Sequence, residues 1–380
     1  MTSKNQHSRR TFVKTLSAGL AAGAAVGGFH TEKDARADDK KSRSENSGNK
    51  KSLGIALVGL GSLSTNQIAP ALQKTANCHL SAIVTGTPEK EEKWASKYNI
   101  AREHIYSYDT FDKIAGDDSI DIVYVVLPNS MHSEYTLRAA KAGKHVFCEK
   151  PMANSVADCQ KMIDACKLAN RQLGIGYRCQ FEPHHQRCIE IARSKDLGAI
   201  RLIDAGFGFK IGDPKQWRLN KQLAGGGALM DVGIYALQAC RYLAGEEPIS
   251  ITAQETKTDA VKFAQVDESI TWTMKFPSGI IAQCSTSYNF NGLNRFKAFS
   301  DNGYIQLDPA FGYSGIEGES SKGPIKFEQV DHFQLELEDF ANCVLENNQS
   351  RVSGEEGLKD LKVIEAIYES IRTGKTVAIS

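Results

Sequence analysis

The stretch Gly59-Leu60-Gly61-Ser62-Leu63-Ser64, which follows the short apolar run Leu53–Val58, decides how this chain begins to fold. Glycines between a strand and a helix let backbone N–H groups approach a pyrophosphate at the positive end of the helix. Ser64 stands where this fingerprint usually has its third glycine. The stretch therefore indicates either a dinucleotide site after the first strand or a glycine turn with a purely structural role.

Short apolar strands alternate with amphipathic helices over the first half of the chain. The predicted strands cover 54–59, 79–84, 120–127, 145–148 and 173–177, and the predicted helices cover 66–74, 89–98, 131–142 and 156–170. The run Ile122–Leu127 is apolar on both faces, as a central parallel strand should be. This alternation predicts βαβ units and a doubly wound parallel sheet, the Rossmann arrangement, over residues 53–175.

The pattern changes after about residue 176. Strand-like runs at 200–209, 249–254, 269–276, 280–288, 295–300 and 303–307 follow one another, with helices at 184–194, 234–243, 333–346 and 357–373. Turn signals such as Pro277-Ser278-Gly279 separate several of the strands. We therefore predict a second domain over 176–380, of α+β class, with an open and mainly antiparallel sheet that serves substrate binding and oligomerisation.

Bulk composition is that of an ordinary soluble globular protein. The formal charge is +1, with 24% charged and 41% hydrophobic residues, which leaves no electrostatic footprint for nucleic acid. Beyond the N-terminus no uncharged apolar run reaches the length of about 18 residues that a membrane span needs, so none is predicted in the mature form. The nine cysteines form no C-x-x-C pair and lie mostly in apolar patterns, so we interpret them as buried free thiols.

The N-terminus resembles a twin-arginine export signal. Arg9 and Arg10 precede an Ala/Gly-rich stretch at 15–29, and Ala35-Arg36-Ala37 offers a cleavage site. A disordered basic tail is the alternative. We predict a signal peptide at 1–37, a linker or arm at 38–52 that is rich in Lys, Ser and Asp, and a periplasmic location for the mature protein.

A second motif, Cys148-Glu149-Lys150-Pro151, closes an apolar run downstream. It resembles the signature of the Gfo/Idh/MocA oxidoreductase family. The stretches 127–130, 148–160, 175–179, 216–219 and 223–248 resemble the glucose-fructose oxidoreductase group of that family, and the resemblance extends from Leu53 to Val377. It implies an NADP-dependent enzyme acting on sugars, a homo-oligomer (dimer or tetramer), and export in the folded state.

Hydride transfer from a sugar carbon leaves a hydroxyl proton to remove, so the chemistry needs a positioned acid/base. The family resemblance assigns a lysine and a tyrosine to this task, here Lys150 and Tyr235, the latter in the second signature Asp231-Val232-Gly233-Ile234-Tyr235. We expect Tyr235 to be the acid/base, with the charge of Lys150 favouring its ionised form. We expect Asp231 to orient Lys150 or the substrate hydroxyl; a helix N-cap is the alternative, and both roles can coexist.

Cofactor choice is predicted from the end of the second strand. NAD-selective sites carry an acidic residue there, whereas this chain has Thr85, Gly86 and Lys90, which favours the 2′-phosphate of NADP; Lys90 as a solvated helix residue is the alternative. The complete set of predicted cofactor contacts is Gly59, Gly61, Ser62, Leu63, Thr85, Gly86, Lys90, Pro128, Asn129, His132, Glu149 and Lys150.

Four residues are predicted to bind the sugar, namely Tyr177, Arg178, Trp217 and Arg218. Aromatic rings suit the apolar face of a sugar and guanidinium groups suit its hydroxyls. We expect His184 and His185 on a helix surface, no metal site, and a tight backbone turn at 225–227.

Export has its own implication for function. Outside the cytoplasm no NADPH pool exists, so we expect an enzyme that retains NADP and recycles it, oxidising an aldose to its lactone and reducing a second sugar. An NAD-dependent glycoside hydrolase, an ordinary sugar dehydrogenase and a non-catalytic sugar-binding relative are the alternatives. The short Lys/Ser/Asn arm before Leu53 departs from the longer, proline-rich arm of the resembled group, which puts permanent retention and the tetramer in question.

Overall fold

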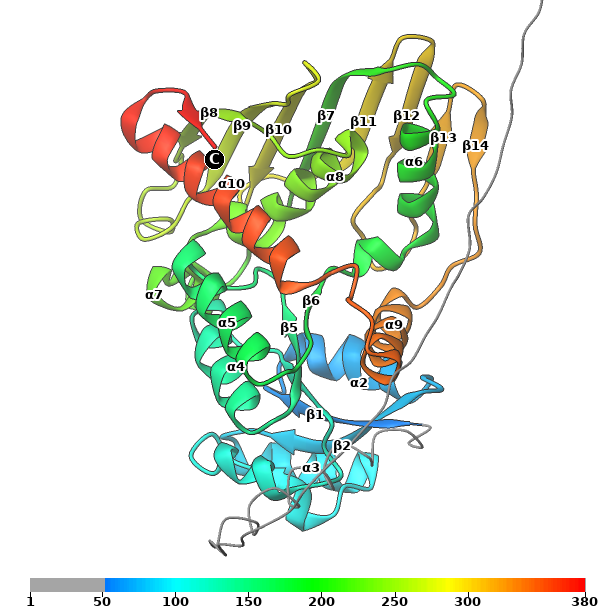
Figure 1. Ribbon diagram of the computed structural model, residues 1–380. Coiled ribbons are helices and arrows are strands. Elements are labelled where there is room, and N and C mark those ends of the chain that lie inside the picture. Colours follow the sequence, from blue (N-terminus) through cyan, green and yellow to red (C-terminus); the bar gives the residue numbers. More distant parts are fainter. Residues whose placement is uncertain (1–51, 380) are drawn as a thin grey trace, which may run out of the picture. The chain divides into compact units, whose positions relative to one another are not determined.

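The computed structural model describes residues 52–379 (Figure 1). The signal peptide predicted at 1–37 and the linker up to residue 51 lie outside the described residues. The apolar run before the glycine turn forms β1 (Leu53–Val58), every residue of which is buried. It lies inside a six-stranded parallel sheet. The doubly wound parallel sheet is therefore confirmed.

The strand order of this sheet is β3-β2-β1-β4-β5-β6. Its other strands are β2 (Cys78–Val84), β3 (Ile105–Tyr106), β4 (Ile122–Val125), β5 (His145–Glu149) and β6 (Leu173–Gly176). The order reverses at β1, between β2 and β4, and doubly wound sheets bind ligands outside the carboxyl ends of their strands at such a point. The residues that follow β1, β2, β4 and β5 therefore gather at one edge.

The helices of this half lie close to their predicted positions. They are a π-type turn at Ser64–Ile68 that continues into α2 (Ala69–Leu72), then α3 (Pro88–Tyr98), α4 (His132–Lys141) and α5 (Val156–Leu168). Helices α4 and α5 lie side by side on one side of the sheet in Figure 1, and α2 lies on the other.

The second half is built on a nine-stranded sheet, in the order β14-β13-β12-β11-β7-β10-β9-β8-β15. The strands are β7 (Ile200–Gly208), β8 (Ser250–Thr256), β9 (Ser269–Lys275), β10 (Ile281–Ser287), β11 (Leu293–Ser300), β12 (Gly303–Leu307), β13 (Gly318–Ser320), β14 (Gly323–Ile325) and β15 (Val377–Ala378). Only β7 and β10 pair in parallel, so the predicted mainly antiparallel sheet is confirmed.

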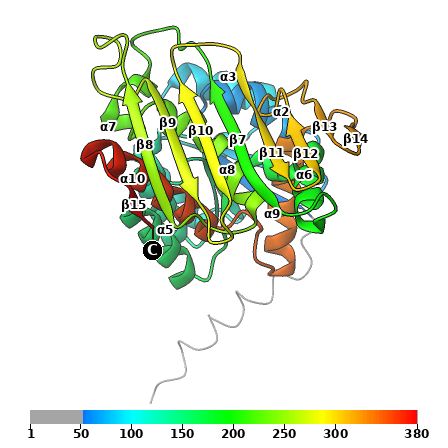
Figure 2. The same cartoon turned by 90° about the horizontal axis from the view of Figure 1, so that it is seen from above.

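Helices cover one face of this sheet, and its opposite face, toward the viewer in Figure 2, is crossed by none of the helices of residues 52–379. These helices are α6 (Pro183–Ser194), α8 (Ile234–Ala244) and α10 (Gly354–Thr373), whereas α7 (Lys221–Ala224) packs against the turn Asn129–Met131. The segment Lys221–Ala244 is long and apolar enough for a membrane span by length and composition, but 78% of the apolar 18-residue stretch within it is buried in the fold. It is therefore a core segment.

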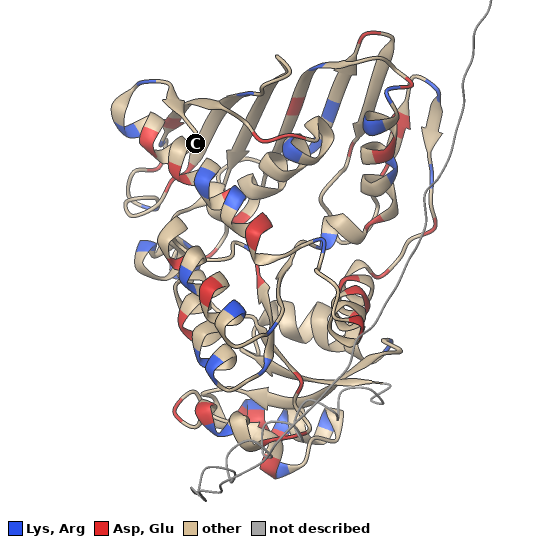
Figure 3. Ribbon diagram, in the orientation of Figure 1, with Lys and Arg blue, Asp and Glu red and all other residues tan. Residues whose placement is uncertain are grey.

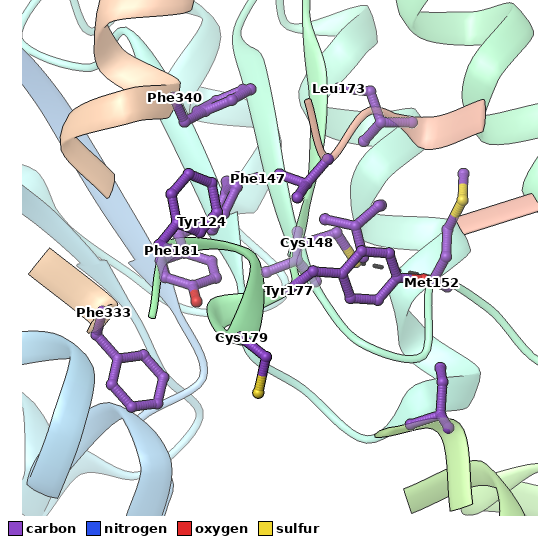
Figure 4. Packing of buried hydrophobic residues seen from close by; sticks show 14 of the residues in the cluster. Tyr124, Phe147, Cys148, Met152, Leu173, Tyr177, Cys179, Phe181, Phe333 and Phe340 are labelled. Carbon is purple, nitrogen blue, oxygen red and sulfur yellow. Dashed lines mark hydrogen bonds between the residues drawn. The ribbon is translucent and has the colours of Figure 1, made fainter. Parts of the chain in front are cut away.

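The chain returns to the first half near its end. Helix α9 (His332–Glu346) packs beside α2, where Asn77 Nδ2 donates to the carbonyl of Glu338 at 2.8 Å. The rings of Phe147 and Phe340 lie 4.9 Å apart (Figure 4). The predicted boundary at residue 175 falls within β6, which ends at Gly176, and the core on the amino-terminal side of it includes a helix from the far end of the sequence.

Charges of both signs are interspersed over the helices (Figure 3). Lys167 of α5 and Glu355 of α10, for example, form an ion pair of 2.8 Å. This pair joins helices from the two halves of the chain.

Candidate active site

The two glycines after β1 have different surroundings. Gly59 has a φ of +92°, and a Cβ there would lie 2.3 Å from the carbonyl oxygen of Val126, so the fold itself requires this glycine. A Cβ on Gly61 would meet nothing within 4 Å. Ser64 replaces the third glycine, and its hydroxyl donates to the Gly59 carbonyl at 2.6 Å. Gly61 thus offers open backbone at the start of a helix, which fits a phosphate group.

Lys90 lies over this turn. Its ammonium donates to the carbonyl of Leu60 at 2.9 Å, so it is tied to the glycine turn instead of extending freely from α3 into solvent. Thr85 is buried, and its hydroxyl accepts the N–H of Thr87 at 3.3 Å, while Gly86 is exposed. An amine beside the start of a helix fits an anionic dinucleotide.

Asp231 is the centre of the second cluster. Lys150, directly after β5, donates from Nζ to the carbonyl of Asp231 at 2.7 Å and to Oδ1 at 3.3 Å. Arg218 and Tyr288 both reach Oδ2, at 3.0 and 2.9 Å. Burial acts to raise the pKa of Asp231, but Lys150 and Arg218 outweigh it and lower the pKa to about 2. Asp231 stands inside the π-type turn Leu229–Gly233, so the helix-cap alternative is wrong.

Tyr235, at the start of α8, lies next to this cluster. Two cations flank its ring: Lys150 Nζ is 4.9 Å from the ring centroid and Arg178 Cζ is 5.0 Å from it. Burial raises the pKa of the phenol above its ordinary value, and the strongest opposing influence is Arg178. The expectation that Lys150 ionises Tyr235 is therefore corrected: the phenol keeps its proton at neutral pH, and the cation with most influence on it is Arg178.

Tyr177 and Arg178 do not face a sugar site. Tyr177 is buried in the core, as Figure 4 shows. Arg178 is also buried, and its guanidinium donates to the carbonyls of Phe311 and Gly312 at 2.6 and 3.0 Å. The short 3₁₀ segment Arg178–Phe181 turns both side chains inward. The sugar-binding prediction is corrected for both. Arg178 instead lies beside the ring of Tyr235 and acts on the pKa of its phenol.

Trp217 and Arg218 lie on the other side of Asp231. Both are half-buried, and the guanidinium of Arg218 lies 4.6 Å from the ring centroid of Trp217. Because this pair combines an aromatic face with a charged donor next to Asp231, its predicted contact with a sugar suits its position.

Two predicted cofactor contacts are instead structural. The ring nitrogens of His132 face the carbonyls of Leu127 and Pro151 at 2.8 and 2.9 Å, and the ring is wholly buried, which lowers its pKa. The carboxylate of Glu149 points into the core, where it accepts the hydroxyl of Tyr124 at 2.6 Å. Both predictions are corrected: the ring nitrogens of His132 and the carboxylate oxygens of Glu149 have their partners within the chain, where they fix the loops after β4 and β5.

The remaining predicted contacts stay at the strand edge. Ser62 is exposed, and Leu63 and Pro128 are half-buried. Asn129 is buried and donates to the carbonyl of Ala224 at 2.8 Å, which ties the loop after β4 to α7. These side chains follow β1 and β4. The strand order reverses at β1, so they lie at the edge of the sheet where a ligand is expected.

Sequence reasoning also missed several residues. His184 and His185 are buried, not on a helix surface, and each ring is hydrogen-bonded to Glu182, at 2.7 and 2.9 Å. Pro183 after an acidic residue is a helix-start signal that could have indicated this cap. Tyr288, which contacts Asp231, belongs to no motif. It directly follows β10, and the alternation of that strand could have indicated that Tyr288 is buried but not that it contacts Asp231.

The turn at 225–227 is confirmed. A Cβ on Gly227 would lie 2.0 Å from the carbonyl oxygen of Asp267, and the Gly227 N–H donates to Asp267 Oδ1 at 2.6 Å. This close approach to Asp267 sets the path of the chain into the turn that carries Asp231.

The parallel sheet with its glycine turn, and the acid/base cluster after β5, define a nucleotide-dependent oxidoreductase. The chain matches the oxidoreductase family with an NAD-binding Rossmann fold at residues 53–177, the GFO/IDH/MocA C-terminal domain at 185–306, and the oxidoreductase C-terminal alpha/beta domain at 324–379. It belongs to the Gfo/Idh/MocA family.

Its relatives include D-xylose 1-dehydrogenase [NADP(+)] of Haloarcula marismortui, 30% identical over 94% of this chain and 99% of that protein. Among solved structures, aldose-aldose oxidoreductase of Caulobacter crescentus, in complex with glycerol, is 45% identical over 86% of this chain and 100% of that one, with a TM-score of 0.84. Levoglucosan dehydrogenase, with a TM-score of 0.74 and 21% identity, shares the fold.

Proposed function

We propose that this protein is a sugar–sugar oxidoreductase that acts in the periplasm with retained NADP. It oxidises an aldose to its lactone and reduces a second sugar, fructose or another aldose, in alternating half-reactions. The observation that carries the proposal is the cluster in which Lys150 and Arg218 hold Asp231 beside Tyr235. The relative named aldose-aldose oxidoreductase, at 45% identity, supports the substrate class.

Each residue of the cluster has its own role in the proposed reaction. When bound, NADP supplies the hydride acceptor and, once reduced, the hydride donor. Tyr235 takes the proton of the sugar hydroxyl in the oxidative half-reaction and returns one to the carbonyl oxygen of the second sugar in the reductive half-reaction. Its raised pKa keeps it protonated at neutral pH, so the proton for the reductive half-reaction is present. Arg178, 5.0 Å from the ring centroid, stabilises the ionised phenol that proton acceptance requires.

NADP rather than NAD is favoured by charge. Lys90 is the cation fixed over the glycine turn, and Thr85 stands where an acidic residue would repel a 2′-phosphate. Retention follows from the proposed location, because an exported enzyme without a nucleotide supply works only if the hydride taken from one sugar is passed to the next. The twin-arginine pattern is what supports this location.

The purified protein, produced with its own signal, tests the proposal in two stages. Denaturation should release about one NADP per chain and no NAD. Given an aldose alone, the native protein should reduce its bound nucleotide once and stop, and addition of fructose or a second aldose should restore the oxidised form, with parallel-line kinetics. Release of free sugar from a glycoside without net redox change would show a hydrolase instead. A need for stoichiometric free NADP would show an ordinary dehydrogenase.

A further inference from the structure

Cys179, Glu182 and His185 lie together near Tyr235, and the proposed sugar reaction uses none of the three. Cys179 belongs to the 3₁₀ segment that also carries Arg178, and Glu182 and His185 follow at the start of α6. Glu182 Oε2 accepts both the Nδ1 proton and the backbone N–H of His185, at 2.9 and 3.0 Å. The carboxylate therefore fixes the imidazole with Nε2 as its free end.

His185 lines a cavity. It is 95% buried, and its Nε2 has no hydrogen-bond partner among residues 52–379. Cys179, His185 and Tyr235 line the same small, mostly apolar cavity of about 20 Å³, together with Phe296 and Phe311. A site of this size holds roughly one water-sized molecule. An unpaired imidazole nitrogen and a thiol in the wall of such a cavity indicate a small polar ligand.

The charges around Cys179 distinguish it from the other thiols. Burial acts to raise its pKa, but the neighbouring Arg178 and His185 outweigh this and lower the pKa of Cys179 from its ordinary value. Burial acts to lower the pKa of His185, but Cys179 and Glu182 outweigh it and raise this pKa to about 9. Tyr235 of α8 and Glu336 of α9 also interact with this thiol. Burial raises the pKa of the cysteines at 78, 148, 159, 166, 188, 284 and 343 instead.

We propose that Cys179 is an oxidation site for hydrogen peroxide, with His185 as its proton donor and Glu182 as the group that holds His185. The thiolate sulfur attacks one peroxide oxygen, so that an S–O bond forms and the O–O bond breaks. The leaving hydroxide takes the Nε2 proton of His185 and departs as water. Sulfur is oxidised by two electrons to the sulfenic acid, and peroxide is reduced.

Cys343 provides a matched control within the same chain. It is more exposed than Cys179, but burial and Asp339 raise its pKa to about 11. Because the neighbouring cations lower the pKa of Cys179 while the pKa of Cys343 is raised, Cys179 has the larger thiolate fraction at pH 7, and the thiolate is the form that reacts. Cys179 should therefore be oxidised faster than Cys343, despite its burial.

The experiment exposes the native full-length protein to hydrogen peroxide for increasing times at pH 7, traps sulfenic acid with dimedone in denaturant, and quantifies each cysteine peptide by mass spectrometry. With bulky tert-butyl hydroperoxide, the ratio of Cys179 to Cys343 labelling should fall, because the cavity excludes it. His185→Gln and Glu182→Gln should slow labelling of Cys179 and leave Cys343 unchanged, with thermal unfolding reporting that the variants are folded.

Equal or slower labelling of Cys179 than of Cys343 in the wild-type protein overturns the proposal, and this comparison needs no variant. Unchanged Cys179 labelling in folded His185→Gln would show that the histidine is not the proton donor. The readout is independent of the proposed sugar reaction, because it follows sulfur chemistry alone.

Discussion

Replacing Gly61 with alanine should weaken nucleotide binding and leave the fold intact, whereas the same change at Gly59 should destabilise the fold. Both glycines belong to the same turn, but their surroundings differ. A Cβ at Gly61 would meet no atom of the chain within 4 Å, and the φ of Gly61 lies outside the left-handed region. Alanine in place of Gly59 would have to adopt the φ of +92°, and its Cβ would lie 2.3 Å from the Val126 carbonyl oxygen.

The magnitudes follow from these surroundings. The left-handed backbone alone costs Gly59→Ala roughly 1–2 kcal/mol, or roughly 2–8 °C in melting temperature, and the clash adds to this. Gly61→Ala should stay within about 0.5 kcal/mol of wild type in unfolding free energy. Its methyl group occupies the approach of a phosphate to the turn, and the loss of a hydrogen bond to a charged group, about 1.5–3 kcal/mol, weakens binding about 10–150-fold.

Melting temperature of the nucleotide-free proteins and nucleotide affinity by titration separate the two effects. Nucleotide content after purification gives a third reading. If Gly61→Ala binds NADP as tightly as wild type, the glycine turn serves the fold alone and the cofactor site lies elsewhere. If Gly61→Ala melts as low as Gly59→Ala, the open space assigned to Gly61 is wrong.

Four further outcomes are expected. Tyr235→Phe and Lys150→Met should keep bound nucleotide and slow its single-turnover reduction by an aldose about 10²–10⁴-fold; rates within a few-fold of wild type would remove these residues from catalysis. The oxidative half-reaction should accelerate about tenfold per pH unit from pH 6 to 9, because the raised pKa of Tyr235 keeps its ionised form rare, and a plateau at pH 7 would identify another base. Lys90→Met should reduce the preference for NADP over NAD about 10–100-fold, measured by competitive titration. Replacing Arg9 and Arg10 together with lysine should leave folded, active precursor in the cytoplasm, and normal export would show another route.

The first sheet was predictable because short strands that are apolar on both faces, such as β1, alternate with helices. The second was predictable because in strands such as β9 every second side chain is buried. Periodicity could not predict β3 or β15, which are two residues long and exist only through pairing with a neighbour. The return of α9 to the first half was equally hidden. Its apolar stripe predicts a helix but does not identify the surface that the helix covers.

At the site, motifs predicted Lys150 and Arg218, which meet at Asp231, but neither Tyr288 nor the direction of the neighbouring side chains. Arg178 and Glu149 are charged residues beside recognisable motifs, and a sequence places such groups by default toward solvent or ligand. Both point inward because buried partners satisfy them, namely the backbone carbonyls of Phe311 and Gly312 for the guanidinium and Tyr124 for the carboxylate. Such pairings form only in the folded chain.

The packing of α9 against α2 has a consequence for synthesis. The amino-terminal half leaves the ribosome long before residues 332–346, so until then the loop at Asn77 lacks its hydrogen bond to Glu338 and Phe147 lacks the ring of Phe340. The nucleotide-binding half thus keeps an uncovered apolar surface until α9 has been synthesised. A chain that stops before α9 would carry every residue of the glycine turn and of the Asp231 cluster and still expose that surface.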